Sequence, residues 1–435
     1  MAVPTTTTAE LVSKADGLYE HKKVDEAAAI YQQVLDATAP SASNTDPSVI
    51  SQILRDQETA LLKLGEIYRD QQNAEALSQV ITHSRTFMSQ TTAKAKTAKL
   101  IRTLLSFFAQ IPDSLPVQKQ TLLANIEWAQ SQKRVFLKHS LETRLAGLYL
   151  DGQEYRKALS LVDGLLAELK RLDDKMILTE VHLLESKIYR GIGNMAKAKA
   201  ALTSARTAAN SIYCPPSLQA ALDLQSGILH AEDKDYTTAY SYFYEAFEGM
   251  SAHGESGALG ALKYMLLCKI MLNLPEDVTS LLTIKLAAKY AQLRDVESMR
   301  AVARAHQDRN LADFEKALRE YRTIELSSDP TIRSHLAALY DTLLQQNLLR
   351  IIEPYEVVEI AHVAEVVGQD LQAVEVKLSQ MILDKVFSGV LDQGRGCLLV
   401  FDRQEEDEIY TSGIETLEEV GKVVQSLYAK TVKIA

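Results

Sequence analysis

The segment YLDGQEYRKALSLVDGLL, residues 149–166, predicts two helices joined by a short turn. Its polar residues 151–154 are preceded by leucines spaced three and four apart over 141–148, which is the spacing of one helix face. They are followed by Ala158 and, four positions later, Val162. A small alanine lets two antiparallel helices approach closely, and the larger apolar residue fills the groove beside it. We therefore predict a helical hairpin here.

The same pattern recurs along the chain: an apolar residue, an alanine three positions later, and a large apolar residue four positions after that. Its instances are Val24/Ala27/Tyr31, the imperfect Asn73/Ala76/Val80, Tyr155/Ala158/Val162, Met195/Ala198/Leu202, Tyr236/Ala239/Phe243 and Phe314/Ala317/Tyr321. The period is about 40 residues, with two gaps of about twice that length. Two degenerate copies are therefore expected in the gaps, and their weak candidates are Val117/Thr121 and Val278/Leu282.

One hairpin cannot bury its apolar face alone, whereas stacked hairpins share a continuous core. The repeats therefore predict an all-α, tetratricopeptide-like, right-handed helical solenoid over residues 11–326, after a Thr-rich flexible tail, residues 1–10. An ordinary helical bundle with coincidental spacing is the alternative.

The sequence changes character at Asp329 and Pro330, which interrupt the repeats. The elements expected after them are helices over 332–349 and 355–367, a third helix capped by Asp370, and a β hairpin with its second strand at 397–401. Three helices and a hairpin predict a winged helix, residues 329–402.

An acidic loop, residues 403–413, and a C-terminal helix, residues 414–435, follow the predicted winged helix. Apolar residues on this helix alternate in spacing between three and four: Leu417, Val420, Val424 and Leu427, continued by Thr431 and Ile434. This is a heptad seam, but it is too short for a confident free coiled coil. The helix either docks on its own domain or joins a bundle of helices from partner chains, and we favour the bundle.

Charge and motifs argue against nucleic-acid binding, catalysis and metal binding. The chain has 47 basic and 57 acidic residues, a net charge of -10, which disfavours general nucleic-acid binding. The predicted winged helix carries seven acids against three bases between residues 355 and 401, so we expect it to bind protein and not DNA. We find no phosphate loop, no H-x-H or H-E-x-x-H motif and no Cys-x-x-Cys pair. We expect no enzyme activity, cofactor, metal, small-molecule substrate or membrane span.

Residues 91–144, here called the basic region, reverse the sign of the chain, with nine lysines and arginines against three acids. This region is a candidate docking surface for an acidic partner, whose binding would weaken with salt. Its candidate contact residues are Lys94, Lys96, Lys99, Lys133, Arg134 and Lys138. A merely solvated face is the alternative.

Residues 334–401, SHLAALYDTLLQQNLLRIIEPYEVVEIAHVAEVVGQDLQAVEVKLSQMILDKVFSGVLDQGRGCLLVF, resemble the winged helix of PCI-domain proteins. Together with YLDGQEYRKAL from Tyr149 and the terminal LEEVGKVVQSLYAKTVKIA, they resemble the family of PCI-domain non-ATPase regulatory subunit eleven of the 26S proteasome lid. The resemblance implies a PCI helical part from about residue 225. It brings no catalytic residues.

For function, the resemblance implies a structural lid subunit of the 19S regulatory particle that braces the lid to the ATPase ring and the 20S core in ubiquitin-dependent degradation. The implied partners are other PCI lid subunits, the ATPase ring and the 20S core, in the cytoplasm and nucleus. The seam would then belong to the lid's helical bundle and the basic region to the arm that reaches the core. A scaffold of the related signalosome is one alternative, and a winged-helix nucleic-acid-binding protein is an alternative of another class.

Overall fold

The structure is a computed structural model that describes residues 8–20, 23–36, 47–90, 94–112, 114–253, 257–308, 311–320, 330–401 and 408–432. The chain divides into two units, Met1–Leu229 and His230–Ala435. The predicted tail and acidic loop lie partly outside the described residues. Within those segments, a first helix begins at Thr8 and the last helix begins at Glu408.

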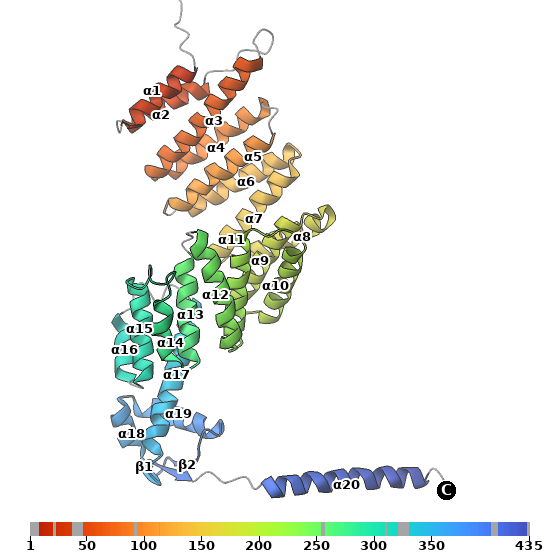
Figure 1. The fold of residues 1–435 in the computed structure, drawn as a ribbon, viewed down its shortest axis with the longest axis vertical. Coiled ribbons are helices and arrows are strands. Elements are labelled where there is room, and N and C mark those ends of the chain that lie inside the picture. Colours follow the sequence, from red (N-terminus) through yellow and green to blue (C-terminus); the bar gives the residue numbers. More distant parts are fainter. Residues whose placement is uncertain are drawn as a thin grey trace, which may run out of the picture. The chain divides into compact units, whose positions relative to one another are not determined.

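The first unit consists of helices in antiparallel pairs. Neighbouring helices pack side by side in the pairs α1 with α2, α3 with α4, α7 with α8 and α9 with α10 (Figure 1). The elements are α1 (Thr8–Glu20), α2 (Val24–Asp36), α3 (Pro47–Asp70), α4 (Ala74–Gln90), α5 (Lys94–Phe107), the 3₁₀ turn η1 (Phe108–Gln110), α6 (Leu115–Ser131), α7 (Val135–Asp151), α8 (Tyr155–Leu172), α9 (Lys175–Ile192), α10 (Met195–Asn210) and α11 (Pro216–Glu232).

Several hairpin turns place one residue in the left-handed backbone conformation. Between α9 and α10, Gly193 is left-handed (φ 89°), and the N–H groups of Gly193 and Asn194 donate to carbonyls of the last turn of α9. Asn194 then caps α10 by accepting from the N–H of Lys197 at 3.2 Å. This arrangement satisfies orphan groups of both helices. Left-handed residues occupy the corresponding turns before α4, α8, α12 and α14, at Gln72, Gln153, Lys234 and Asn273, and Lys133 is left-handed in the connection between α6 and α7.

The small alanines lie where the pattern predicted. Ala27, Ala158 and Ala198 are fully buried between paired helices, as is Ala239 in the second unit, whereas Ala76 of the imperfect copy is only half-buried. The helices that carry the pattern begin at Val24, Ala74, Leu115, Tyr155, Met195, Tyr236, Pro275 and Leu311. Helices therefore fill both gaps, as α6 and α14. Three and seven positions after the start of α14 lie the candidate residues Val278 and Leu282, but in α6 these positions are Gln118 and Leu122, one residue after the candidate pair Val117/Thr121. The prediction of an all-helical, solenoid-like stack is confirmed.

The second unit contains further helices and the only sheet among the described residues. Its elements are α12 (Tyr236–His253), α13 (Ala258–Met271), α14 (Pro275–Leu282), α15 (Arg294–Gln307), α16 (Leu311–Glu320), α17 (Pro330–Ile352), β1 (Val357–Glu359), α18 (Ile360–Val367), α19 (Leu371–Leu383), β2 (Ser388–Asp392), β3 (Cys397–Phe401) and α20 (Glu408–Val432). Phe243 of α12 stacks on Tyr264 of α13 with ring centroids 5.1 Å apart.

The segment from α17 to β3 packs three helices on a small antiparallel sheet of order β1-β3-β2. The prediction of a helix from residue 355 was wrong in its first turn, where β1 lies instead. Val357 and Val358 are β-branched and pair with Leu399 and Leu398 of β3, so strand pairing overrides the helical spacing. Asp370 does occupy the cap position of α19, although its side chain makes no capping hydrogen bond.

Candidate functional site

The seam on α20, defined as Leu417, Val420, Val424 and Leu427, is exposed to solvent. Its four side chains are between 53% and 73% exposed, and every described side chain from 412 to 428 is exposed as well. The side chain of Thr431 and the whole of Ile434 lie outside the described residues. An apolar stripe at heptad spacing gains stability only when another surface covers it, so this exposed stripe is suited to contact with another helix.

The residues of the basic region are distributed over three helices and a turn. Lys99 on α5 is exposed, and Lys133 is exposed in the left-handed turn before α7. Arg134 stacks its guanidinium over the ring of Trp128 at 5.1 Å. Lys94 and Lys96 fall in the first turn of α5, and their side chains lie outside the described residues.

Acids from α8 partly neutralise the basic region. Lys138 Nζ lies 2.9 Å from Glu168, whose carboxylate also lies 2.8 Å from Nε2 of the buried His139. Lys119 binds Glu154 at 2.6 Å, and this hydrogen bond is the largest cause that lowers the pKa of Glu154 to about 2. Glu168 is 30 residues from Lys138 along the chain, and Glu154 is 35 residues from Lys119. Both acids lie outside residues 91–144, so the charge count over the basic region did not include them. The periodicity was the available signal, because residues about one repeat apart become neighbours.

The third helix of the predicted winged helix, α19, exposes apolar side chains. Val376 and Leu383 are 70% and 80% exposed. Its one lysine, Lys377, is mostly buried and lies 3.4 Å from Asp341 of α17. A phosphate backbone would thus meet no unpaired cation on the described face of this helix, which favours protein contacts.

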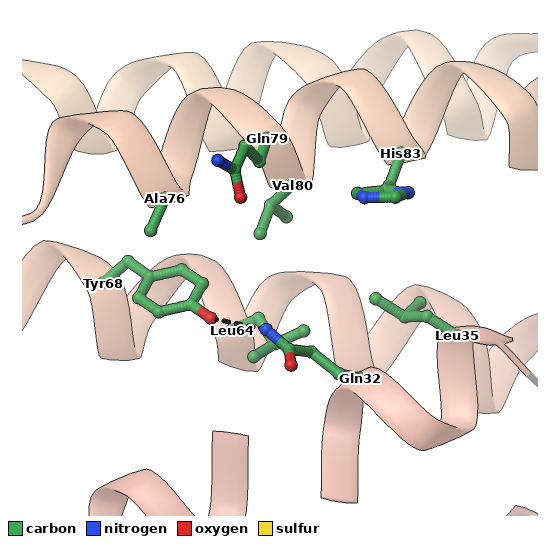
Figure 2. A pocket seen from close by; sticks show the side chains of 8 residues that line it. All are labelled: Gln32, Leu35, Leu64, Tyr68, Ala76, Gln79, Val80 and His83. Carbon is green, nitrogen blue, oxygen red and sulfur yellow. Dashed lines mark hydrogen bonds between the residues drawn. The ribbon is translucent and has the colours of Figure 1, made fainter. Parts of the chain in front are cut away.

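A pocket open to solvent lies among α2, α3 and α4 (Figure 2). The sequence patterns did not predict it. Its volume is about 250 Å³, and Leu64 and Val80 contribute apolar walls. Gln32 Nε2 donates to the hydroxyl of Tyr68 at 2.9 Å, and Gln79 and His83 of α4 also line the pocket.

Catalytic or metal chemistry has little support in the part of the chain that the structure describes. No group of three His, Cys, Asp or Glu side chains there could hold a metal ion. Burial raises the pKa of the Cys268 thiol to about 12, so it stays protonated and weakly nucleophilic. No helix among the described residues is long and apolar enough to cross a membrane.

Three family descriptions match consecutive parts of the chain. They are the 26S proteasome regulatory subunit RPN6 N-terminal domain over residues 8–152, the PCI domain over 314–402, and the RPN6 C-terminal helix domain over 406–431. The last of these covers α20 and its seam. The three matches occur in the order that the predicted architecture requires.

Several relatives match almost end to end. The chain is 50% identical to the probable 26S proteasome regulatory subunit rpn6 of Schizosaccharomyces pombe, covering 95% of this chain and 96% of that one. It is 48% identical to 26S proteasome regulatory subunit RPN6 of Saccharomyces cerevisiae, covering 96% and 97%. It is also 48% identical to the 26S proteasome non-ATPase regulatory subunit 11 homolog of Arabidopsis thaliana, covering 89% and 92%. Because the family descriptions and the near end-to-end relatives agree, the chain belongs to the family of 26S proteasome regulatory subunit RPN6, also called non-ATPase regulatory subunit 11.

Proposed function

We propose that the chain is a non-catalytic structural subunit of the lid of the 26S proteasome regulatory particle. The observation that carries this proposal is the exposed seam on α20. A single chain leaves these four apolar side chains in water, whereas a bundle with helices of other PCI lid subunits covers them. Family membership supplies the assembly in which such helices are available.

The helical repeats have a second role in this proposal, which is to brace the lid to the ATPase ring and the 20S core. Stacked hairpins present long continuous surfaces, and this supports a bracing role. Lys99 and Lys133 are exposed cations on this stack, which supports contact with an acidic partner. By this role the chain supports ubiquitin-dependent protein degradation in the cytoplasm and nucleus.

The seam is tested by the double variant Val420→Glu/Val424→Glu in the tagged full chain. The matched control is Gln425→Glu/Ser426→Glu, which adds the same two charges. At 100° per residue, these control positions lie on the side of α20 away from the seam. Affinity purification, gradient sedimentation and mass spectrometry then measure which proteasome subunits accompany each variant.

We expect the wild-type chain and the control to sediment with proteasome subunits as a very large particle, and the seam variant to sediment alone. Circular dichroism should show that both variants remain folded, because α20 contributes no buried side chain from 412 to 428. Deletion from Glu415 onward should act like the seam variant. A seam variant that assembles like its control contradicts the bundle role, and a wild-type chain that sediments alone contradicts the proposal as a whole.

A further inference from the structure

A small polar pocket lies on the face that α5, α7 and α9 form. These are the first helices of three successive hairpins. The pocket has a volume of about 210 Å³ and is lined by Arg102, Leu105, Ser140, Leu141, Thr143, Arg144 and Glu180. Small-molecule sites usually occupy about 300–1,000 Å³, so this pocket matches a single side chain better than a cofactor.

Arg144 is the anchored cation of the pocket. Its Nη2 donates to the carbonyl oxygen of Leu105 at 2.5 Å, in the last turn of α5, where helix carbonyls lack intrahelical partners. This bond holds the guanidinium in place and uses one of its five N–H donors. Burial lowers the pKa of Arg144, since desolvation disfavours the charged form. An anion in the pocket would offset that desolvation.

Arg102 and Glu180 face the same space from α5 and α9. Arg102 is exposed, and Glu180 is half-buried. Burial, and then the charge of Asp174, raise the pKa of Glu180, while Arg102 lowers it. Within the described ranges, Arg102, Arg144 and Glu180 have no ion-pair partner within 4.0 Å. The two arginines can therefore engage an incoming anion without giving up an existing salt bridge.

The carboxylate of Glu180 selects among anions. A phosphate group carries close to two negative charges at neutral pH, and Glu180 would repel it about twice as strongly as a carboxylate. A carboxylate also matches the planar, two-donor geometry of a guanidinium, and Ser140 adds a hydroxyl donor at the pocket wall. The lining thus favours a singly charged, planar anion.

We propose that this pocket receives the carboxylate of an Asp or Glu side chain from a neighbouring subunit of the assembly, held by Arg102 and Arg144 and oriented away from Glu180. This inference rests on the proposed structural role, because it names a chemical contact that the helical repeats make. Arg102 and Arg144 belong to the basic region but were not among its candidate contact residues, and Glu180 lies outside that region.

The first test compares charge variants of the tagged full chain in purified particles. Arg102→Glu removes the exposed cation, Glu180→Gln removes the repelling carboxylate, and Arg156→Glu is the control, an exposed arginine on α8 outside the pocket. We expect Arg102→Glu to dissociate about tenfold faster in a salt wash and Glu180→Gln to dissociate about threefold more slowly. The control should match the wild-type chain. Melting temperatures of the isolated chains show that folding is unchanged.

The second test identifies the occupant. In particles carrying Arg102→Lys, a zero-length carbodiimide should join the introduced amine to a carboxylate in contact with it, and mass spectrometry locates the new amide bond. We expect a bond to an Asp or Glu of another subunit. A bond to Glu180 alone, or no bond, overturns the proposal.

The two proposals fail in different ways. If the wild-type chain brings proteasome subunits with it but the three charge variants dissociate alike, the pocket inference is wrong and the structural role stands. If inorganic phosphate stabilises the wild-type chain more than chloride at equal ionic strength, and Arg102→Glu abolishes this effect, the pocket binds a free phosphate and the carboxylate assignment is overturned. If the wild-type chain sediments alone, the structural role itself fails.

Discussion

Glu315 on α16 should hold the last repeat helices against the α17–β3 segment. Its Oε1 accepts hydrogen bonds from the hydroxyl of Tyr340 on α17 at 3.1 Å and from Nε2 of Gln369, after α18, at 2.9 Å. Gln369 Nε2 also lies 3.0 Å from the Tyr340 hydroxyl. Burial and then the Glu315 hydrogen bond raise the pKa of Tyr340 to about 12, in keeping with a closed network.

Glu315→Ala removes a charged acceptor from two donors. Hydrogen bonds to charged groups contribute about 1.5–3 kcal/mol each, and partial exposure reduces this. Because the Glu315 side chain is 28% exposed and water can replace it, we expect a loss of about 2 kcal/mol for the pair. This loss corresponds to a fall of about 4–8 °C in the melting temperature of a unit of this size.

The assay is thermal unfolding together with hydrogen exchange in peptides from α16, α17 and α18. The expected loss corresponds to about 30-fold faster exchange of amides that open with this network. Arg319→Ala is the control, because it removes only the exposed ion pair to Glu315 at 3.1 Å and should change stability by less than about 0.5 kcal/mol. If Glu315→Ala behaves like Arg319→Ala, the network does not couple the two elements.

Two further predictions concern the first unit. At Gly65 an added Cβ would lie 2.6 Å from Leu104 Cδ2, so Gly65→Ala should lower the free energy of unfolding by about 1 kcal/mol once its gain in helix propensity is subtracted. Gly164→Ala has nothing within 4 Å of the new Cβ and should raise it by about 0.5–1 kcal/mol, as measured by urea unfolding. Burial raises the pKa of Glu142 above its usual 4.5, because the folded state disfavours the charged carboxylate. The folded protein therefore loses stability as the pH rises from the pKa of Glu142 in the unfolded chain to its higher pKa in the folded chain. Glu142→Gln should therefore melt higher than wild type at neutral pH and equally at pH values below both of these pKa values; an equal difference at every pH refutes this reasoning.

The hairpins could be predicted because their cause is local. A buried alanine such as Ala158 or Ala198 sits at a fixed distance after a turn, and that turn has its own chemistry at residues like Gly193 and Asn194. The pattern repeats because each pair packs in the same way on the next one. The period also indicated where the degenerate helices lie, but only to within one residue in α6, where Leu122 takes the place expected for Thr121.

Contacts between repeats were harder to predict. Glu154, at the start of α8, reaches Lys119 on α6 of the preceding hairpin, and the pocket around Arg144 needs residues from α5, α7 and α9 together. No single stretch of sequence contains such a set. Strand β1 escaped prediction for a related reason, because Val358 forms a strand only where Leu398 is available to pair with it.

The heptad seam shows the opposite case, in which the sequence predicts a contact that the single chain does not make. α20 has 25 residues, and two of them, Gly413 and Gly421, each lower helix propensity by about 1 kcal/mol relative to alanine. Isolated helices gain little from propensity alone, and most helical stability in proteins comes from packing of an apolar face. Since no described side chain from 412 to 428 is buried, that packing has to come from outside the chain's own core. The spacing of Leu417, Val420, Val424 and Leu427 is what the proposed helical bundle requires, and burial within the described part of this chain gives no account of it.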